Sequence, residues 1–88
     1  MVYNISYDLN KPGQVYDELY ETIEGLGDCI HPLDSTWLVS TSLSAEDIRD
    51  RLITVVDKTD ALLVNKASVP GAWFNLAPDD TAWLKSKL

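Results

Sequence analysis

Asp8 is the residue of this sequence whose type and position best suit chemistry. It closes a predicted strand and precedes a turn. Strand parity puts Asp8 on the face opposite Tyr3, Ile5 and Tyr7, which is the face that we expect the helices to leave open. A carboxylate there could hold a hard divalent cation or orient a water molecule. The alternative is a turn-forming aspartate that accepts hydrogen bonds from nearby backbone N–H groups, and the residues alone favour it.

A metal site at Asp8 would need a second copy of the chain. One carboxylate is a poor magnesium site, because Mg²⁺ takes several oxygen ligands. A symmetric dimer would bring two Asp8 side chains together and supply more of them. Ser6 and Asn10 would be the neighbours able to orient such a site.

The other reactive side chains are expected to be structural. Cys29 and His31 stand two residues apart, without further soft ligands near enough in sequence for a zinc site. A free cysteine usually behaves as a small buried hydrophobe. The sequence contains no Walker loop, dinucleotide glycine fingerprint or nucleophile elbow.

Tryptophan is frequent for so short a chain, with three among 88 residues. Trp37 falls on a predicted strand and Trp73 in a Gly-Ala-Trp-Phe stretch. Core filling is the ordinary role of both, whereas an exposed indole would anchor a dimer or partner interface. Asn10 and Ser35, both next to predicted turns, complete the candidate binding residues.

The charge of the chain is −7, from 14 acidic and 7 basic residues. Between Gln14 and Asp28 there is no Lys or Arg, and the acidic residues before Asp28 are Asp17, Glu18, Glu21 and Glu24. Such a run is ordinarily a solvated helix face, and the alternative is a docking face for a basic protein surface. Because this acidic run repels the phosphate groups of nucleic acids, we expect nucleic-acid binding to be weak.

Hydrophobic periodicity predicts the elements that carry these residues. Residues 2–8 alternate, as in a strand with one covered face. Helical spacing follows in Val15, Leu19, Ile23 and Leu26. Residues 29–33 predict an edge or irregular strand because they contain a proline, and residues 36–41 predict a regular one.

The second half of the chain predicts a helix, a strand and a terminal helix. Ser44 is a suitable N-cap for a helix over residues 45–57, with Asp47 as its capping-box partner. A strand is predicted over 61–66, a loop or short strand over 68–76, and a helix from Pro78. The expected core comprises Tyr3, Ile5, Tyr7, Leu19, Ile23, Ile48, Leu52 and Val56.

This order predicts a ferredoxin-like α+β fold, βαββαβ, with a four-stranded antiparallel sheet and an extra C-terminal helix. We expect a single domain over residues 1–88, with its core in 1–67 and an extension in 68–88. One cysteine permits no internal disulfide and favours the cytoplasm. No run approaches the roughly 18 apolar residues of a membrane span.

Three segments resemble a known family. They are Val-Tyr-Asn-Ile-Ser-Tyr-Asp-Leu-Asn at 2–10, Pro12-Gly13-Gln14, and Asp-Ser-Thr-Trp-Leu-Val at 34–39. They look like the SinR-like small proteins of bacteria and phages, which in turn are similar to the small CRISPR-associated adaptation protein and to VapD-type toxin ribonucleases. The resemblance implies that Asp8 matches an aspartate used with Mg²⁺ or Mn²⁺ in phosphodiester hydrolysis across a dimer axis.

Two main functions remain open at this point. The first is a small dimeric interaction protein, such as a phage or mobile-element factor that acts on a host or defence protein through its acidic face. The second is a metal-dependent endonuclease or endoribonuclease that uses Asp8 across the dimer interface. A dimer that binds a small ligand between its sheets is a third possibility. The acidity favours the first function, and the family resemblance of Asp8 favours the second.

Overall fold

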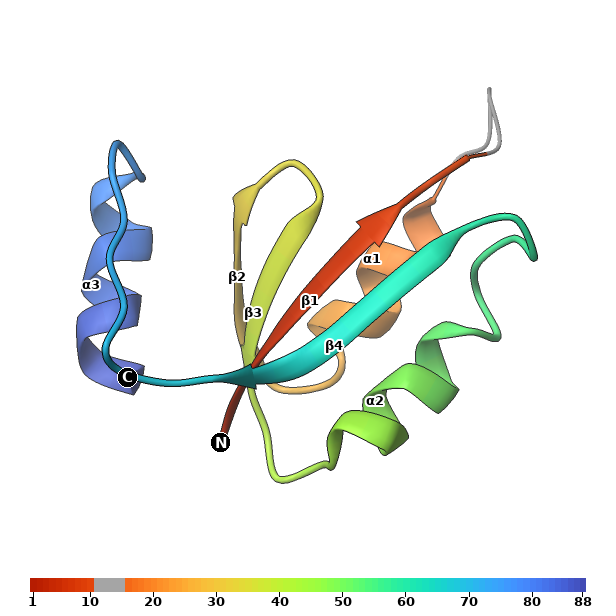
Figure 1. Ribbon diagram of the computed structural model, residues 1–88, viewed down its shortest axis with the longest axis horizontal. Coiled ribbons are helices and arrows are strands. Elements are labelled where there is room, and N and C mark those ends of the chain that lie inside the picture. Colours follow the sequence, from red (N-terminus) through yellow and green to blue (C-terminus); the bar gives the residue numbers. More distant parts are fainter. Residues whose placement is uncertain (11–15) are drawn as a thin grey trace.

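The computed structural model describes residues 1–10 and 16–88 (Figure 1). Val15 of the predicted helical stripe and Pro12-Gly13-Gln14 of the family resemblance lie outside the described residues. Along the described chain the elements are β1 (Val2–Asp8), α1 (Asp17–Glu24), β2 (Asp28–Leu33), β3 (Thr36–Ser40), α2 (Ala45–Leu52), β4 (Ala61–Ala67) and α3 (Pro78–Lys87).

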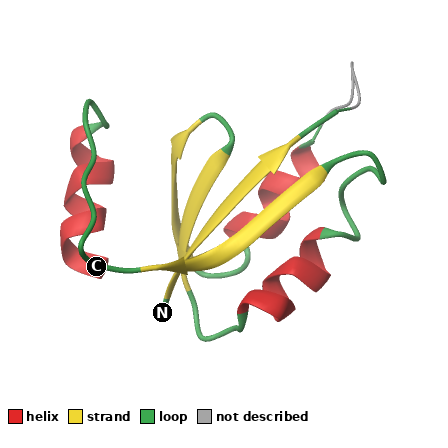
Figure 2. Cartoon of the chain, in the orientation of Figure 1, coloured by secondary structure: helices red, strands yellow, loops and turns green. Residues whose placement is uncertain are grey.

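The four strands form one antiparallel sheet in the order β2-β3-β1-β4, which confirms the α+β class (Figure 2). At its centre, Ile5 lies opposite Trp37 of β3 and Val64 of β4. Residues directly opposite one another share a face, so this register aligns the inward side chains of the three strands.

The core lies between one face of the sheet and helices α1 and α2. Tyr3, Ile5 and Tyr7 of β1 are buried there, as the alternation predicts. The helices contribute fully buried leucine and isoleucine side chains, namely Leu19, Ile23, Ile48 and Leu52. The opposite face of the sheet is covered by neither of these two helices, and we call it the open face.

Helix α2 begins as predicted but ends earlier. Ser44 Oγ accepts a hydrogen bond from the Asp47 N–H at 3.0 Å, and the Asp47 carboxylate accepts one from the Ser44 N–H at 3.4 Å. The helix ends at Leu52, not at residue 57. The β-branched run that comes next has low helix propensity, so Val56 reaches the core from a loop and is only partly buried.

Strand β2 is irregular, as its proline predicts. Its pairing with β3 shifts register between Ile30 and Leu33, on either side of Pro32. Proline lacks an N–H group and tends to occupy edges and bulges. The residue before the strand is Gly27. A side chain does not fit at this position, because a Cβ atom would clash with the Ser40 carbonyl oxygen.

The C-terminal extension forms a loop and then helix α3, which packs against β2 (Figure 1). Leu84 of α3 is buried, and the Lys87 ammonium lies 3.0 Å from the Asp28 carboxylate. That hydrogen-bonded ion pair, together with the nearby Trp83 indole, lowers the pKa of Asp28. Within residues 1–10 and 16–88, every helix is too short or too polar to cross a membrane.

Candidate functional site

A row of polar side chains crosses the open face of the sheet. The amide Nδ2 of Asn4 donates to Asn65 Oδ1 at 3.0 Å and to Ser6 Oγ at 3.1 Å. Ser6 Oγ also lies 3.3 Å from the Thr36 hydroxyl. The row therefore ties β4, β1 and β3 together through side chains that are already hydrogen-bonded. Sequence reasoning missed this network, although the polar positions of β1 alternate in the right phase.

Asp8 is exposed at the end of this row, directly opposite Ala61 of β4. It borders a shallow hollow of about 260 Å³ together with Ser6, Tyr7 and three residues of β4. The predicted side of the strand is thus confirmed for Asp8, and Ser6 shares its hollow. Within one copy of the chain, this hollow contains a single carboxylate.

That donor set does not suit a divalent metal. In the described residues, no three His, Cys, Asp or Glu side chains lie close enough together to bind an ion. The Ser6 hydroxyl is already engaged with neighbouring side chains. A Mg²⁺ or Mn²⁺ site at Asp8 would need further oxygen ligands from outside this copy.

Asn10 belongs to a different cluster, centred on Asp60 in the loop before β4. The Asp60 carboxylate accepts hydrogen bonds from the Asn10 N–H at 2.7 Å, the Asp57 N–H at 2.8 Å and the Tyr16 hydroxyl at 3.0 Å. The Asn10 side chain also donates to the Thr59 carbonyl at 3.0 Å. Desolvation by itself raises the pKa of Asp60, but these hydrogen bonds outweigh it and hold that pKa below its ordinary value.

The Asp60 cluster fastens the segments after β1 and before α1 to the loop before β4. Sequence reasoning missed it because its members are far apart in the chain. The one local signal is the Asp-Lys-Thr-Asp run at 57–60, since aspartate side chains commonly bind backbone N–H groups in turns. Asn10 therefore has a structural role in this fold.

Trp37 is a core residue with 5% of its surface exposed. Its indole N–H donates to the Tyr7 hydroxyl at 3.1 Å, and that hydroxyl donates to the Asp34 carbonyl at 3.3 Å. Burial raises the pKa of Tyr7 to about 12, even though the Trp37 hydrogen bond acts in the opposite direction. His31 stacks on Trp37 at a ring-centroid distance of 4.0 Å and contacts the Asp34 carbonyl through Nε2 at 3.1 Å.

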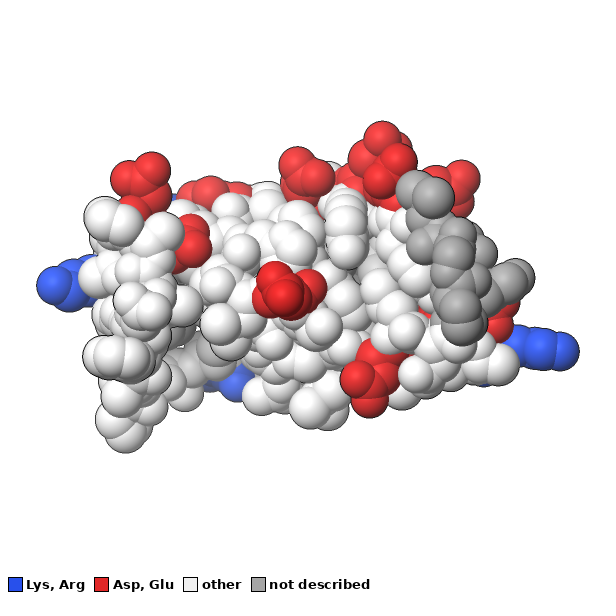
Figure 3. Space-filling model, turned by 90° about the horizontal axis from the view of Figure 1, so that it is seen from above, with Lys and Arg blue, Asp and Glu red and all other residues white. Residues whose placement is uncertain are grey.

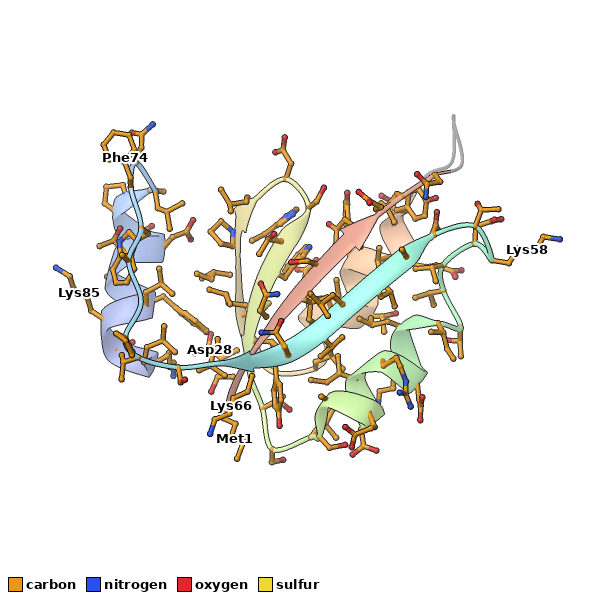
Figure 4. The ribbon with its side chains drawn as sticks, in the orientation of Figure 1. Met1, Asp28, Lys58, Lys66, Phe74 and Lys85 are labelled. Atoms are coloured by element: carbon orange, nitrogen blue, oxygen red, sulfur yellow. The ribbon has the colours of Figure 1, made fainter. Side chains whose placement is uncertain are left out.

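Trp73 and Ser35 are accessible at the surface, in contrast to Trp37. Trp73 is 39% exposed, and its neighbour Phe74 is 92% exposed at the tip of the C-terminal loop (Figure 4). Ser35 is exposed in the β2–β3 turn, where its carbonyl accepts a hydrogen bond from the Tyr7 N–H at 3.2 Å. Between the open face and the C-terminal segment lies a groove of about 370 Å³, with Leu33, Leu38, Trp73, Leu76, Leu84 and Leu88 in its lining.

The predicted acidic face lies on α1. Its four carboxylates are exposed, and none pairs with a Lys or Arg in residues 1–10 or 16–88: Asp17, Glu18, Glu21 and Glu24. The helix has two acids in its first turn and no base in its last turn. In Figure 3 acidic side chains far outnumber basic ones on the face shown, where Lys and Arg are visible mainly at the two ends.

A scan against protein-family models, a search of curated proteins and a search of solved structures each found no match to this chain. The resemblance to the SinR-like proteins therefore remains a proposal.

Proposed function

We propose that this protein is a small dimeric interaction protein that docks onto a basic surface of another protein through helix α1. The observation that carries this proposal is the set of four exposed carboxylates on α1, in a helix that contains no base. Opposite charge steers such a face toward basic partners and speeds their encounter. The same charge disfavours a nucleic-acid backbone as its ligand.

We infer that the fold is ferredoxin-like. Its support is the element order β1-α1-β2-β3-α2-β4 combined with the sheet order β2-β3-β1-β4, in which β1 and β3 are the central strands. The open face, with exposed Leu33 and Leu63, supports self-association as a way to cover apolar surface. The resemblance to the SinR-like family supports a phage or mobile-element factor that acts on a host or defence protein.

An oligo-arginine peptide labelled with a fluorophore tests the acidic face. We expect it to bind in a salt-dependent manner and to bind at least tenfold more weakly to the triple variant Glu18→Gln, Glu21→Gln and Glu24→Gln. The matched control removes three exposed carboxylates elsewhere, by Asp34→Asn, Glu46→Gln and Asp79→Asn. Equal weakening in both variants would show that net charge alone, and not α1, determines binding.

The second candidate is a metal-dependent nuclease that uses Asp8 with Mg²⁺ or Mn²⁺. It is favoured by the hollow at Asp8, which is open enough for a substrate to approach. It requires a dimer in which two Asp8 carboxylates meet, because one copy offers a single carboxylate there.

A further inference from the structure

The two edges of the sheet differ in how they are protected. Along β2, Pro32 and the register shift interrupt regular pairing, and α3 packs against the strand. Strand β4, at the other edge, pairs with β1 over all seven of its residues without a shift. It contains no proline, and no described element pairs with its outer side. An unprotected regular edge of this kind can accept another strand.

The surroundings of β4 suit an added strand. Leu63 is 61% exposed on the open-face side of the strand, and Ile53 is 55% exposed just after α2. A cavity of about 230 Å³ runs between α2 and β4 and is lined by Arg49, Leu62 and Leu63 among others. A neighbouring cavity of about 380 Å³ shares Arg49 and Leu62 and includes Ile53. Apolar side chains of an incoming strand would therefore find partly apolar space on the helix side.

We propose that β4 pairs antiparallel with β4 of a second copy of this chain, about a two-fold axis at Leu63. This inference rests on the dimer of the proposed function and assigns its interface. In this register Leu63 lies opposite its own copy, and Leu62 lies opposite Val64 of the second copy. Ala61 then lies opposite Asn65, and Asp60 lies opposite Lys66. A two-fold axis makes each of these pairs occur twice, apart from the central one.

Charge complementarity selects this register and favours a second copy as the occupant. The apolar centre Leu62-Leu63-Val64 is flanked by Asp60 at one end and Lys66 at the other, so antiparallel self-pairing matches opposite charges. In Asp60, Oδ1 accepts two of the hydrogen bonds of its cluster and Oδ2 accepts one. A carboxylate can accept about four hydrogen bonds, so Asp60 Oδ2 can still accept one from the ammonium of Lys66 in the second copy.

The position of the acidic helix also favours this edge. Helix α2 packs against β4, whereas α1, on the same face, packs against β2 at the opposite edge of the sheet. Residues 44–67 carry a net charge close to zero, because their acidic residues outnumber their basic residues by one. The acids are Glu46, Asp47, Asp50, Asp57 and Asp60, and the bases are Arg49, Arg51, Lys58 and Lys66. Pairing at β4 therefore joins two copies of charge −7 through a weakly charged surface and keeps their α1 faces apart.

Sedimentation velocity of the full chain tests the interface. We expect the wild type to sediment at twice its mass of 9.8 kDa, with a dimer dissociation constant raised at least tenfold by Leu63→Glu. That substitution sets two carboxylates against each other at the axis. Phe74→Glu is the matched control, because it adds the same charge at an exposed apolar residue away from β4. Circular dichroism of each variant checks that the fold is retained.

Disulfide cross-linking locates the axis independently. In a Cys29→Ala background, Leu63→Cys should form an intermolecular disulfide under mild oxidation, since facing residues of paired strands have Cα atoms about 4.5–5.5 Å apart. Phe74→Cys in the same background should remain largely uncrosslinked. Efficient cross-linking at residue 63 together with dissociation by Leu63→Glu supports the proposal.

Two results would overturn the proposed β4 interface, and they differ in whether the dimer itself is retained. A wild-type dimer that Leu63→Glu does not weaken and Leu63→Cys does not cross-link places the interface elsewhere and leaves the dimer intact. A monomeric wild type overturns both this interface and the dimer. Neither result touches docking through α1, which the oligo-arginine assay measures separately.

Discussion

At the scale of single residues, the chemistry open to Asp8 depends on how many oxygen ligands surround it. Asp8 is exposed and is the single carboxylate lining its hollow. We expect Mg²⁺ at millimolar concentration to leave the melting temperature of the wild type unchanged, because one carboxylate offers too few oxygen ligands to bind the ion. An ion that did bind the native state would raise the melting temperature. Differential scanning fluorimetry measures this. A rise that Asp8→Asn abolishes would instead support the nuclease.

We expect the Asp60 carboxylate to make the stability of the fold depend on pH in the acid range. Its pKa in the folded chain lies below the ordinary value, so its contribution to stability is present above the unfolded-state pKa and is lost as pH falls through the folded-state pKa. We expect Asp60→Asn to remove part of the loss of stability that the wild type shows below about pH 4. Urea midpoints measured from pH 6 to pH 2.5 test this. Parallel pH profiles for the two proteins would contradict it.

We expect Tyr7 to make the stability of the fold depend on pH in the alkaline range. Burial raises its pKa to about 12, so its contribution is present below the unfolded-state pKa of about 10 and is lost as pH rises through 12. Tyr7→Phe should therefore make the protein less sensitive to alkaline unfolding between those values. It should also lower stability at neutral pH, because the buried Trp37 N–H loses its acceptor. Fluorescence-monitored urea unfolding at pH 7 and pH 11 measures both effects.

At the scale of elements, helix α2 offers the sharpest stability tests. Leu52→Ala should cost about 2–5 kcal/mol, because Leu52 is fully buried against the sheet. Ser44→Ala should cost about 1 kcal/mol by removing the helix cap. The free energy of unfolding in urea gives both values. A Leu52→Ala midpoint equal to that of the wild type would remove α2 from the core.

Elements were predictable where local signals sufficed. The alternation of β1, the Ser44 cap and the Pro32 irregularity each depend on residues close in sequence, and each is confirmed. The early end of α2 had a local signal in the β-branched residues 53–56, which the predicted helix over 45–57 did not take into account. The Asp60 cluster was not predictable, because it depends on contacts between residues far apart in the chain. For the same reason the sequence could not tell that Trp37 would be buried and Trp73 exposed.

At the scale of the whole molecule, the proposed β4 pairing and the nuclease hypothesis make opposite demands. Asp8 lies opposite Ala61, two residues from the axis at Leu63. Its copy would then be displaced by three strand spacings and four residues, which separates the two Asp8 backbones by about 20 Å. Two carboxylates at that distance cannot share one ion. Proof of the β4 interface would therefore argue against a metal bridged by Asp8.

Net charge governs the remaining prediction at this scale. Each phosphate contact requires a cation, and the chain has 7 bases against 14 acids. We expect no measurable binding of duplex DNA at micromolar protein and 0.15 M salt. Fluorescence anisotropy of a labelled duplex tests this, and tight binding there would mean that a local arrangement of bases overrides the charge of −7.

The irregular strand β2 has a consequence for stoichiometry. Sheets with two regular edges can add copies without limit, and that growth leads to fibres. In this protein Pro32, the register shift and α3 make one edge unsuitable for pairing. Two copies joined at β4 would then expose only β2 edges, so growth would stop after a single step. The proline and the C-terminal helix would thus act as terminators of polymerisation, which lets the chain retain an adhesive edge without becoming an aggregate.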